Sequence, residues 1–224
     1  MKVPSPLNGW RVFFGEVGII VLGVLLALGA QQLVEAANWR REVSDFREAI
    51  DEELGKNLSI YKVRLQQSKC VERRLAELQQ LADLPTGASA PKRLHPIATI
   101  DSYSYFFSVW DNKDADVMAH LPLKTRTKYA EIYDEFINEE RNRTYENAVW
   151  RSMARFNLAE PMTHDDRRQL TEMLADARRF DSNRRYNHPV ALALTDALGI
   201  KARPLPYAIE GAGDFCKPLF ARLR

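Results

Sequence analysis

One unbroken apolar run near the N-terminus constrains the fold of this chain more than any other feature. Residues 17–30 carry no polar side chain, and the apolar stretch as a whole covers residues 12–34. As a helix rising about 1.5 Å per residue, that stretch is roughly 35 Å long. This length matches a hydrocarbon core of about 30 Å that is crossed with some tilt. The pattern predicts a transmembrane helix over residues 12–34, preceded by a short tail over residues 1–11.

An apolar N-terminal run is also typical of a cleaved secretory signal. Lys2 and Arg11 fit the basic region of such a signal, and the small residues within 27–29 fit its cleavage site. Two observations favour an uncleaved anchor. The run is longer than the ~7–15 apolar residues of a signal, and a helical pattern continues through residues 35–47 without Pro or Gly. We therefore expect a single-pass membrane protein whose main partner is the lipid bilayer.

The orientation of the span follows from weaker signals. Lys and Arg residues are nearly balanced on its two sides, so the positive-inside rule does not decide the orientation. The N-terminal tail is too short to be the working part of the protein, and two cysteines suit an oxidising compartment. We expect a cytoplasmic N-terminus and a C-terminal domain on the extracytoplasmic, periplasmic side of the cytoplasmic (inner) membrane.

Within the span, one stripe combines an ionisable residue with small residues. Glu16, Gly23, Ala27 and Ala30 recur at helical spacing, and small residues four apart let a second helix approach closely. The stripe predicts self-association into a homo-oligomer. The alternative is that Glu16 reaches the interface at the N-terminal end of the helix, where negative charge is favoured, and that the small residues recur by chance.

The rest of the chain predicts an all-α fold. Apolar residues spaced by three or four run through residues 35–83, with charged residues opposite, and the stripe weakens only at Ser68. This pattern indicates a long amphipathic helix that continues from the membrane span. Residues 84–96 contain three prolines and a glycine, which predicts a loop.

A bundle-like helical domain is expected over residues 97–200. We expect a short helix within 97–121 and a long helix over about 123–158, with Pro122 at its start. A capping box at Thr163 and Asp166 predicts the next helix. The last helix should cover about 183–198, starting properly near Pro189 and ending at Gly199. Residues 201–224 are rich in Pro and Gly, which predicts an irregular C-terminal tail.

Two groups of residues are candidates for a special role in this domain. The first is an aromatic cluster, whose members fit either the core or the wall of a ligand pocket: Tyr103, Tyr105, Phe106, Phe107 and Trp110. The second is the cysteine pair Cys70 and Cys216, the only cysteines of the chain. Outside the cytoplasm such a pair is a disulfide candidate that would join the tail to the first long helix.

Catalytic chemistry finds no support in the sequence. The four histidines show none of the spacings of zinc or di-iron sites. Residues 111–116 resemble a calcium loop superficially, but they lack its glycine and its acidic pattern. A net charge of +2 argues against nucleic acid as a partner. We therefore expect no enzyme activity, no catalytic residues, no metal and no cofactor.

The N-terminal region resembles a family of uncharacterised bacterial single-pass membrane proteins. The resemblance lies in Phe14, Gly15 and Glu16, in the apolar run over 20–28, and in Trp39 ahead of a charged helix. It departs from the family pattern after the span, where Asn38 precedes Trp39 instead of following it. The resemblance implies a membrane anchor followed by a helical domain of unknown function, and it supplies no catalytic residues.

These features together predict a membrane-anchored helical scaffold or interaction protein. Its protein partner is not identified by the sequence, apart from a second copy of the chain. The alternative is a membrane-tethered sensor that binds a ligand under the aromatic residues 103–110.

Overall fold

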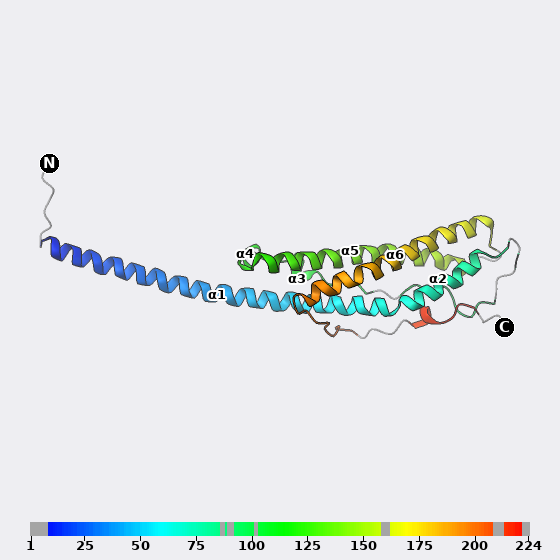
Figure 1. Cartoon of the computed structure of the whole chain (residues 1–224), viewed down its shortest axis with the longest axis horizontal. Helices are drawn as coiled ribbons and strands as arrows, with labels where there is room; N and C mark the ends of the chain where they lie inside the picture. The colour runs from blue at the N-terminus through cyan, green and yellow to red at the C-terminus, as the bar shows by residue number, and fades with distance from the viewer. Residues whose placement is uncertain are drawn as a thin grey trace, which may run out of the picture. The chain divides into compact units, whose positions relative to one another are not determined.

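The computed structural model of this chain is helical, as the sequence predicts (Figure 1). It describes residues 9–85, 88, 92–100, 103–157, 162–207 and 213–220. Within these ranges there is no β-strand, only an isolated antiparallel bridge between Arg93 and Phe220. Residues 1–8 of the predicted N-terminal tail lie outside the described residues, as do parts of the predicted loop 84–96 and of the predicted tail 201–224.

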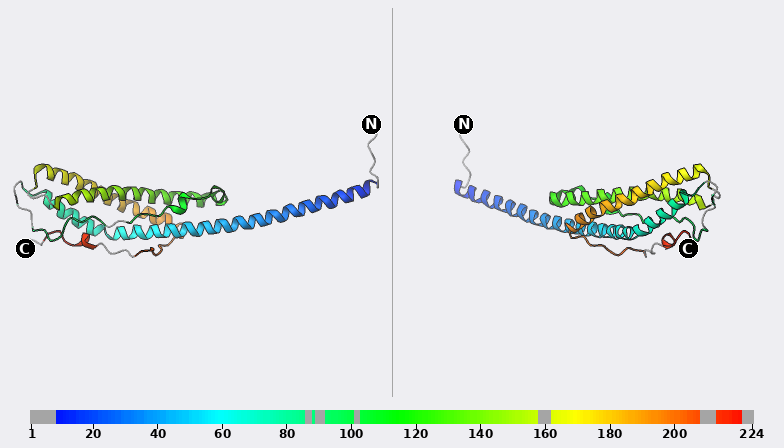
Figure 2. Two further views of the ribbon diagram at one scale, coloured as in Figure 1. Left: turned by 180° about the vertical axis from the view of Figure 1, so that it is seen from behind. Right: turned by 45° about the vertical axis from the view of Figure 1, so that its right-hand side comes forward.

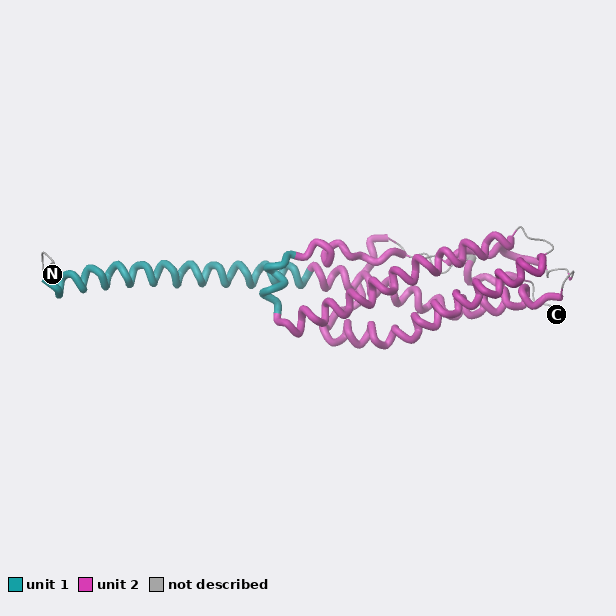
Figure 3. The backbone as a smooth tube through the Cα atoms, turned by 90° about the horizontal axis from the view of Figure 1, so that it is seen from above, with its two compact units in different colours: residues 1–48, 114–121 teal, residues 49–113, 122–224 magenta. Residues whose placement is uncertain are grey.

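Six α-helices and two short 3₁₀ helices occur in the described ranges. The α-helices are α1 (Trp10–Gln66), α2 (Ser68–Ala82), α3 (Ser108–Asp111), α4 (Ala115–His120), α5 (Leu123–Met153) and α6 (His164–Asp196). The 3₁₀ helices are η1 (Ala154–Asn157) and η2 (Gly213–Cys216). The chain divides into two compact units, coloured separately in Figure 3. We call residues 1–48 with 114–121 the N-terminal unit, and residues 49–113 with 122–224 the helical unit.

The N-terminal unit contains the apolar run as part of α1. None of the residues of α1 within 12–34 is buried, and large apolar side chains such as Leu25, Leu26 and Leu33 are more than half exposed. Among the described residues, this is one helix that is long and apolar enough to cross a membrane. A signal sequence near an N-terminus can meet the same criteria of length and composition.

The helical unit is built from three long segments. Residues 49–66 of α1 and then α2 form the first, α5 runs alongside in the same direction, and α6 returns antiparallel to both (Figures 1 and 2). α6 packs against both α5 and α2. The helices pack because each turns an apolar stripe inward.

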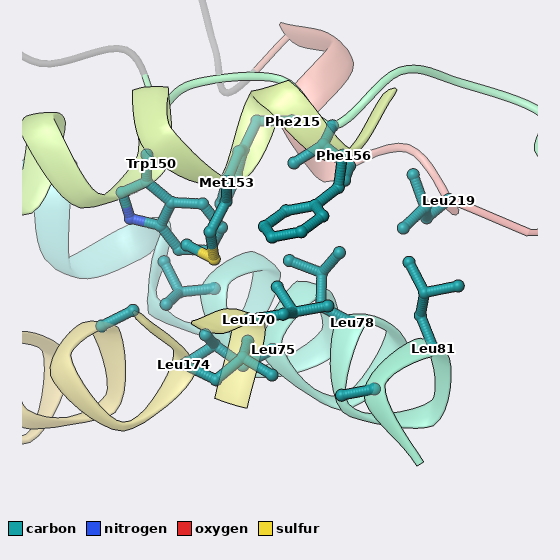
Figure 4. Close-up of a cluster of buried hydrophobic side chains, with 14 of the residues drawn as sticks. Leu75, Leu78, Leu81, Trp150, Met153, Phe156, Leu170, Leu174, Phe215 and Leu219 are labelled. Atoms are coloured by element: carbon teal, nitrogen blue, oxygen red, sulfur yellow. The ribbon is translucent and has the colours of Figure 1, made fainter. Parts of the chain in front are cut away.

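The apolar core of this unit has two groups of residues along the helices. In the first group, Leu54 and Tyr61 of α1 and Phe136 of α5 are fully buried. The second group lies around Leu78 of α2 and Trp150 of α5 and includes residues of the tail (Figure 4). Its labelled members are Leu75, Leu78, Leu81, Trp150, Met153, Phe156, Leu170, Leu174, Phe215 and Leu219.

Local sequence signals explain several helix ends. The predicted weak point near Ser68 is where α1 ends and α2 begins. The Thr163 hydroxyl accepts a hydrogen bond from the Asp166 amide, and the Asp166 carboxylate accepts one from the Thr163 amide, so the predicted capping box is confirmed. After α6, Gly199 has a φ of +73°. The Gly199 and Ile200 amides donate to the carbonyls of Asp196 and Thr195 in the glycine-terminated pattern that stops a helix.

Two predictions about the helical domain were wrong. The region 97–121 is not one short helix: only α3 and α4 are helical, and the described residues 97–100 and 103–107 are irregular. Their backbone groups bond to side chains of other helices instead of to one another. The helix predicted over 183–198 is not separate, because α6 runs unbroken from His164 to Asp196 with Pro189 inside it. Buried Arg184 before the proline and Ala191 after it hold both halves against the core.

Candidate functional site: a buried ion cluster beneath the aromatic residues

The most unusual feature of the helical unit is a group of four buried charged side chains. We call Arg64 of α1, Glu139 and Glu146 of α5 and Arg184 of α6 the buried ion cluster. Glu146 accepts hydrogen bonds from both arginines, at 2.5 Å from Arg64 Nη2 and 2.7 Å from Arg184 Nη2. Arg184 Nε donates a further bond to Glu139 at 2.5 Å. The cluster joins all three long segments.

In each long segment, the charged residues of the cluster lie between the residues that form the two apolar groups of the core. On α5, for example, Glu139 and Glu146 lie between Phe136 and Trp150, all four of them buried. Ionised side chains are costly to bury unless they are paired. Two arginines and two glutamates satisfy this condition, since their formal charges cancel.

The two glutamates of the cluster differ in their electrostatic environment. Burial opposes the charge of Glu146, but Arg64 and Arg184 on either side outweigh it and lower its pKa. Burial also raises the pKa of Glu139, which contacts Arg184 alone, and here burial prevails. Burial lowers the pKa of Arg64, and the neighbouring Arg184 lowers it further. The cluster therefore has one firmly charged carboxylate and one that is nearer to protonation.

Some donors of the cluster have no protein acceptor among the described residues. They are Nε and Nη1 of Arg64 and Nη1 of Arg184. A cavity of about 10 Å³ adjoins Arg64 and Glu139, and the aromatic residues Tyr103 and Tyr105 also line it. This volume is about that of one water-sized probe. A larger ligand does not fit without movement of the surrounding side chains.

The structure places the predicted aromatic residues mostly within the packing of α5. Tyr105 is buried and stacks on Phe136 with ring centroids 5.5 Å apart. Trp110 stacks on Tyr133 at 4.4 Å, and Phe107 approaches the same tyrosine at 6.5 Å. Tyr103 lies elsewhere, against Tyr207 of the tail at 5.5 Å. Of the five predicted aromatic residues only Tyr105 is buried, and the other four are half-buried.

Two polar residues of α1 hold the irregular aromatic segment in place. Asn57 exchanges two hydrogen bonds with the backbone of Phe106, at 2.7 and 2.8 Å. The buried Glu53 carboxylate accepts hydrogen bonds from the Val109 and Trp110 amides at the start of α3. It also accepts one from the Tyr133 hydroxyl at 2.7 Å. With these partners its buried charge is well solvated by the protein.

Cys70 and Cys216 form a disulfide, with Cα atoms 4.9 Å apart across 146 residues of sequence. The bond joins η2 to α2. Arg74 reinforces the junction, because its Nη2 donates to the carbonyls of Phe215 and Lys217 at 3.0 and 2.7 Å. Apart from η2 the described part of the tail is irregular, as expected, and its Phe215 and Leu219 are buried in the core.

The predicted stripe of the membrane span lies on α1. Glu16, Gly23, Ala27 and Ala30 are all exposed, and a Cβ built on Gly23 would meet no atom within 4 Å. A second helix therefore has free access to this face. Self-association through the stripe stays a prediction.

Sequence reasoning missed the buried ion cluster. Its residues looked like members of solvated charged faces, because charged residues at helical spacing usually form exposed ion pairs. One signal was available: Glu139 and Glu146 share a face of α5 with Tyr133, Phe136 and Trp150, which are apolar or aromatic. Charged residues that interrupt an apolar stripe indicate buried pairing.

The described residues contain no group of three or more His, Cys, Asp or Glu side chains that could hold a metal ion. No protein-family model, no curated protein and no solved structure matches this chain. Proposals about its function therefore rest on its own residues.

Proposed function

We propose that this protein is a membrane-anchored helical scaffold or interaction protein. The observation that carries the proposal is the apolar part of α1, in which no residue of the span 12–34 is buried. Large apolar side chains over the whole circumference of a helix are unfavourable in water, and a bilayer removes them from it. The same helix supplies Ile50, Leu54 and Tyr61 to the core of the helical unit, so one continuous α-helix includes both anchor and domain residues.

The proposed location is the cytoplasmic (inner) membrane, with the N-terminus inside and the helical unit on the extracytoplasmic, periplasmic side. The Cys70–Cys216 disulfide supports this orientation, because disulfides persist in oxidising compartments and are rare in the cytosol. The N-terminal resemblance to bacterial single-pass membrane proteins agrees with it.

A scaffold role fits the interior of the helical unit better than ligand sensing does. The cavity beneath the aromatic residues is about 10 Å³, whereas small-molecule sites usually measure about 300–1,000 Å³. The buried ion cluster fixes the register of three helices by charge pairing, which suits a domain that presents a fixed surface.

Membrane fractionation tests the anchor. Full-length protein should remain in membranes after an alkaline carbonate wash, and residues 35–224 expressed alone should not. Release of the full-length chain by carbonate would contradict the proposal. Recovery of a mature chain that begins after residue 29 would show instead that the apolar run is a cleaved signal.

The proposal includes self-association through the stripe Glu16, Gly23, Ala27 and Ala30. In detergent, full-length protein should show a concentration-dependent oligomer that Gly23→Ile removes by blocking the close approach of helices. Gly18→Ile is the matched control, because Gly18 lies about 140° from Gly23 around the helix. A full-length chain that is monomeric at all concentrations would contradict this part of the proposal.

A further inference from the structure

The N-terminal unit contains an open groove next to the end of the predicted membrane span. One face of α1 forms most of it, and His120 of α4 closes one side. We call it the juxtamembrane groove; its lining residues are Gln32, Glu35, Ala36, Trp39, Arg40, Val43 and His120. Its volume is about 430 Å³, which falls within the usual range of about 300–1,000 Å³ for small-molecule sites.

Aromatic stacking fixes the wall of the groove. The rings of Trp39 and His120 stack with centroids 3.9 Å apart and planes 14° apart. His120 Nδ1 lies 2.7 Å from the carbonyl oxygen of Asp116. Because a carbonyl only accepts, Nδ1 donates this bond and holds the ring in place. The wall is thus formed before any ligand binds.

Two opposite charges in the groove have no partner in the described part of the chain. Glu35 and Arg40 form no ion pair or side-chain hydrogen bond there. They are five residues apart, which is about 7.5 Å along the helix axis and about 140° around it, so the two charges flank the groove on opposite edges. The groove therefore offers a free carboxylate and a free guanidinium at two separate points, and a ligand with both charges would complement them.

The position of the groove along α1 indicates where that ligand is found. Trp39 lies five residues beyond Val34, the last residue of the predicted span, or about 7.5 Å further along the helix. The headgroup layer of each leaflet is about 5–8 Å thick, and Trp is enriched at this level of the bilayer. In the proposed anchored state, the groove lies at the depth of phospholipid headgroups.

We propose that the juxtamembrane groove binds the headgroup of a zwitterionic phospholipid that carries a primary ammonium, the phosphatidylethanolamine class. This inference rests on the proposed membrane anchor. The Arg40 guanidinium donates hydrogen bonds to the phosphate, and the Glu35 carboxylate accepts them from the ammonium. A quaternary ammonium has no N–H to donate to Glu35, and an anionic glycerol headgroup meets repulsion from it. The acyl chains lie along the exposed apolar face of α1.

Native mass spectrometry of the full-length chain, released from detergent micelles, tests this site. The micelles contain equal amounts of phosphatidylethanolamine, phosphatidylcholine and phosphatidylglycerol. We expect one retained lipid per chain, with phosphatidylethanolamine preferred. Arg40→Gln should reduce its retention about tenfold or more, since hydrogen bonds to charged groups are the stronger ones. Glu35→Gln should remove the preference over phosphatidylcholine.

Neighbouring residues of α1 supply matched controls. Arg41→Gln and Glu42→Gln change the same charges outside the groove and should leave retention unchanged. Ala36→Trp should fill the groove and abolish retention, whereas Ala37→Trp, one position further on, should not. Soluble phosphoethanolamine at the same concentration should not displace the lipid, because it lacks acyl chains.

Several results would overturn the proposal. They are equal retention of the three lipids, a preference that survives both Arg40→Gln and Ala36→Trp, and full displacement by phosphoethanolamine. Failure of the proposed membrane anchor can be distinguished from failure of the groove proposal, because without the anchor the carbonate wash would release the chain. A chain that stays in carbonate-washed membranes without lipid preference refutes the groove alone.

Discussion

At the residue scale, the buried ion cluster is the feature in which single side chains matter most for the stability of the fold. Glu146 lies between two guanidiniums, and Glu139 contacts one. Breaking a buried ion pair by removing one charge typically costs about 3–5 kcal/mol, because the remaining charge is left uncompensated. The two carboxylates should respond to pH in opposite ways. Burial raises the pKa of Glu139, whereas the two neighbouring arginines outweigh burial at Glu146 and lower its pKa.

We predict opposite pH dependences for the isosteric substitutions Glu146→Gln and Glu139→Gln. The pKa of Glu146 is lowered, so its charge stabilises the fold above the ordinary glutamate pKa of about 4.3 and loses that effect as pH falls further. The stability cost of Glu146→Gln should therefore grow as pH rises toward about 4.3 and then stay constant. The pKa of Glu139 is raised, so the cost of Glu139→Gln should shrink as pH rises above about 4.3.

Urea denaturation of both variants between about pH 3 and pH 7 measures these costs. Glu172→Gln is the control, because Glu172 forms an exposed ion pair with Arg168, and exposed pairs contribute about 0–1 kcal/mol. If the stability costs of Glu146→Gln and Glu139→Gln change in the same direction with pH, the opposite pKa shifts of the two glutamates are contradicted.

Gly55 gives a second prediction at this scale. A glycine in a helix is normally about 1 kcal/mol less favourable than alanine, but here the tail crosses α1 at this position. The Arg203 amide donates to the Gly55 carbonyl at 2.9 Å, and an added Cβ would lie 2.6 Å from the Lys201 carbonyl oxygen. We expect Gly55→Ala to lower the free energy of unfolding by about 1–3 kcal/mol, the usual cost of overpacking.

The same denaturation assay measures the effect of Gly55→Ala. Lys62→Ala, at an exposed position of the same helix, should stay within about 0.5 kcal/mol of the unsubstituted protein. A stabilised Gly55→Ala variant would show that helix propensity prevails and that the tail does not lie against Gly55.

At the scale of elements, the tail depends on its attachment to α2. The disulfide closes a loop of 146 residues, and the chain-entropy model assigns about 5 kcal/mol to closing so long a loop, with measured values often smaller. We predict that Cys70→Ser with Cys216→Ser lowers the free energy of unfolding by about 2–5 kcal/mol. Reduction of the unsubstituted protein should have the same effect.

Amide hydrogen exchange measures whether the tail opens more often when the disulfide is removed. The Leu94 amide donates to the Leu219 carbonyl, and the Leu219 amide donates to Glu77. Both amides should lose protection in the double variant, while those at the centre of α5 should keep it. Unchanged protection at Leu94 and Leu219 would mean that Phe215 and Leu219 hold the tail by packing alone.

Periodicity in the sequence predicted the long helices because each of them buries one apolar stripe. It failed for residues 97–107, since the aromatic residues there have helical separations while their backbone is held by Asn57 and Glu140. It also predicted a separate helix over about residues 183–198, starting properly near Pro189, but packing on both sides of this proline outweighs the lost hydrogen bond and α6 is continuous. The buried ion cluster was not predictable from spacing alone, because pairing between helices depends on how they pack.

At the scale of the whole molecule, the chain combines an exposed apolar helix with a disulfide-bonded helical unit. The apolar helix has the length and composition of a membrane span, and the disulfide is typical of an oxidising compartment. The apolar helix and the pair Cys70 and Cys216 were both recognisable in the sequence, because the length of an apolar run and the number of cysteines can be read from it directly. Which face of the helical unit a partner contacts depends on side chains whose exposure only the fold reveals.

The oxidation state of Cys70 and Cys216 in the membranes of expressing cells tests this account most directly. Cells are quenched in acid, free thiols are blocked with N-ethylmaleimide, and carbonate-washed membranes are treated with a maleimide mass tag before and after reduction. We predict a membrane-retained chain that takes up no tag before reduction and two tags after it. Thiols that are already blocked by N-ethylmaleimide, with no tag taken up after reduction, would contradict an anchored domain in an oxidising compartment.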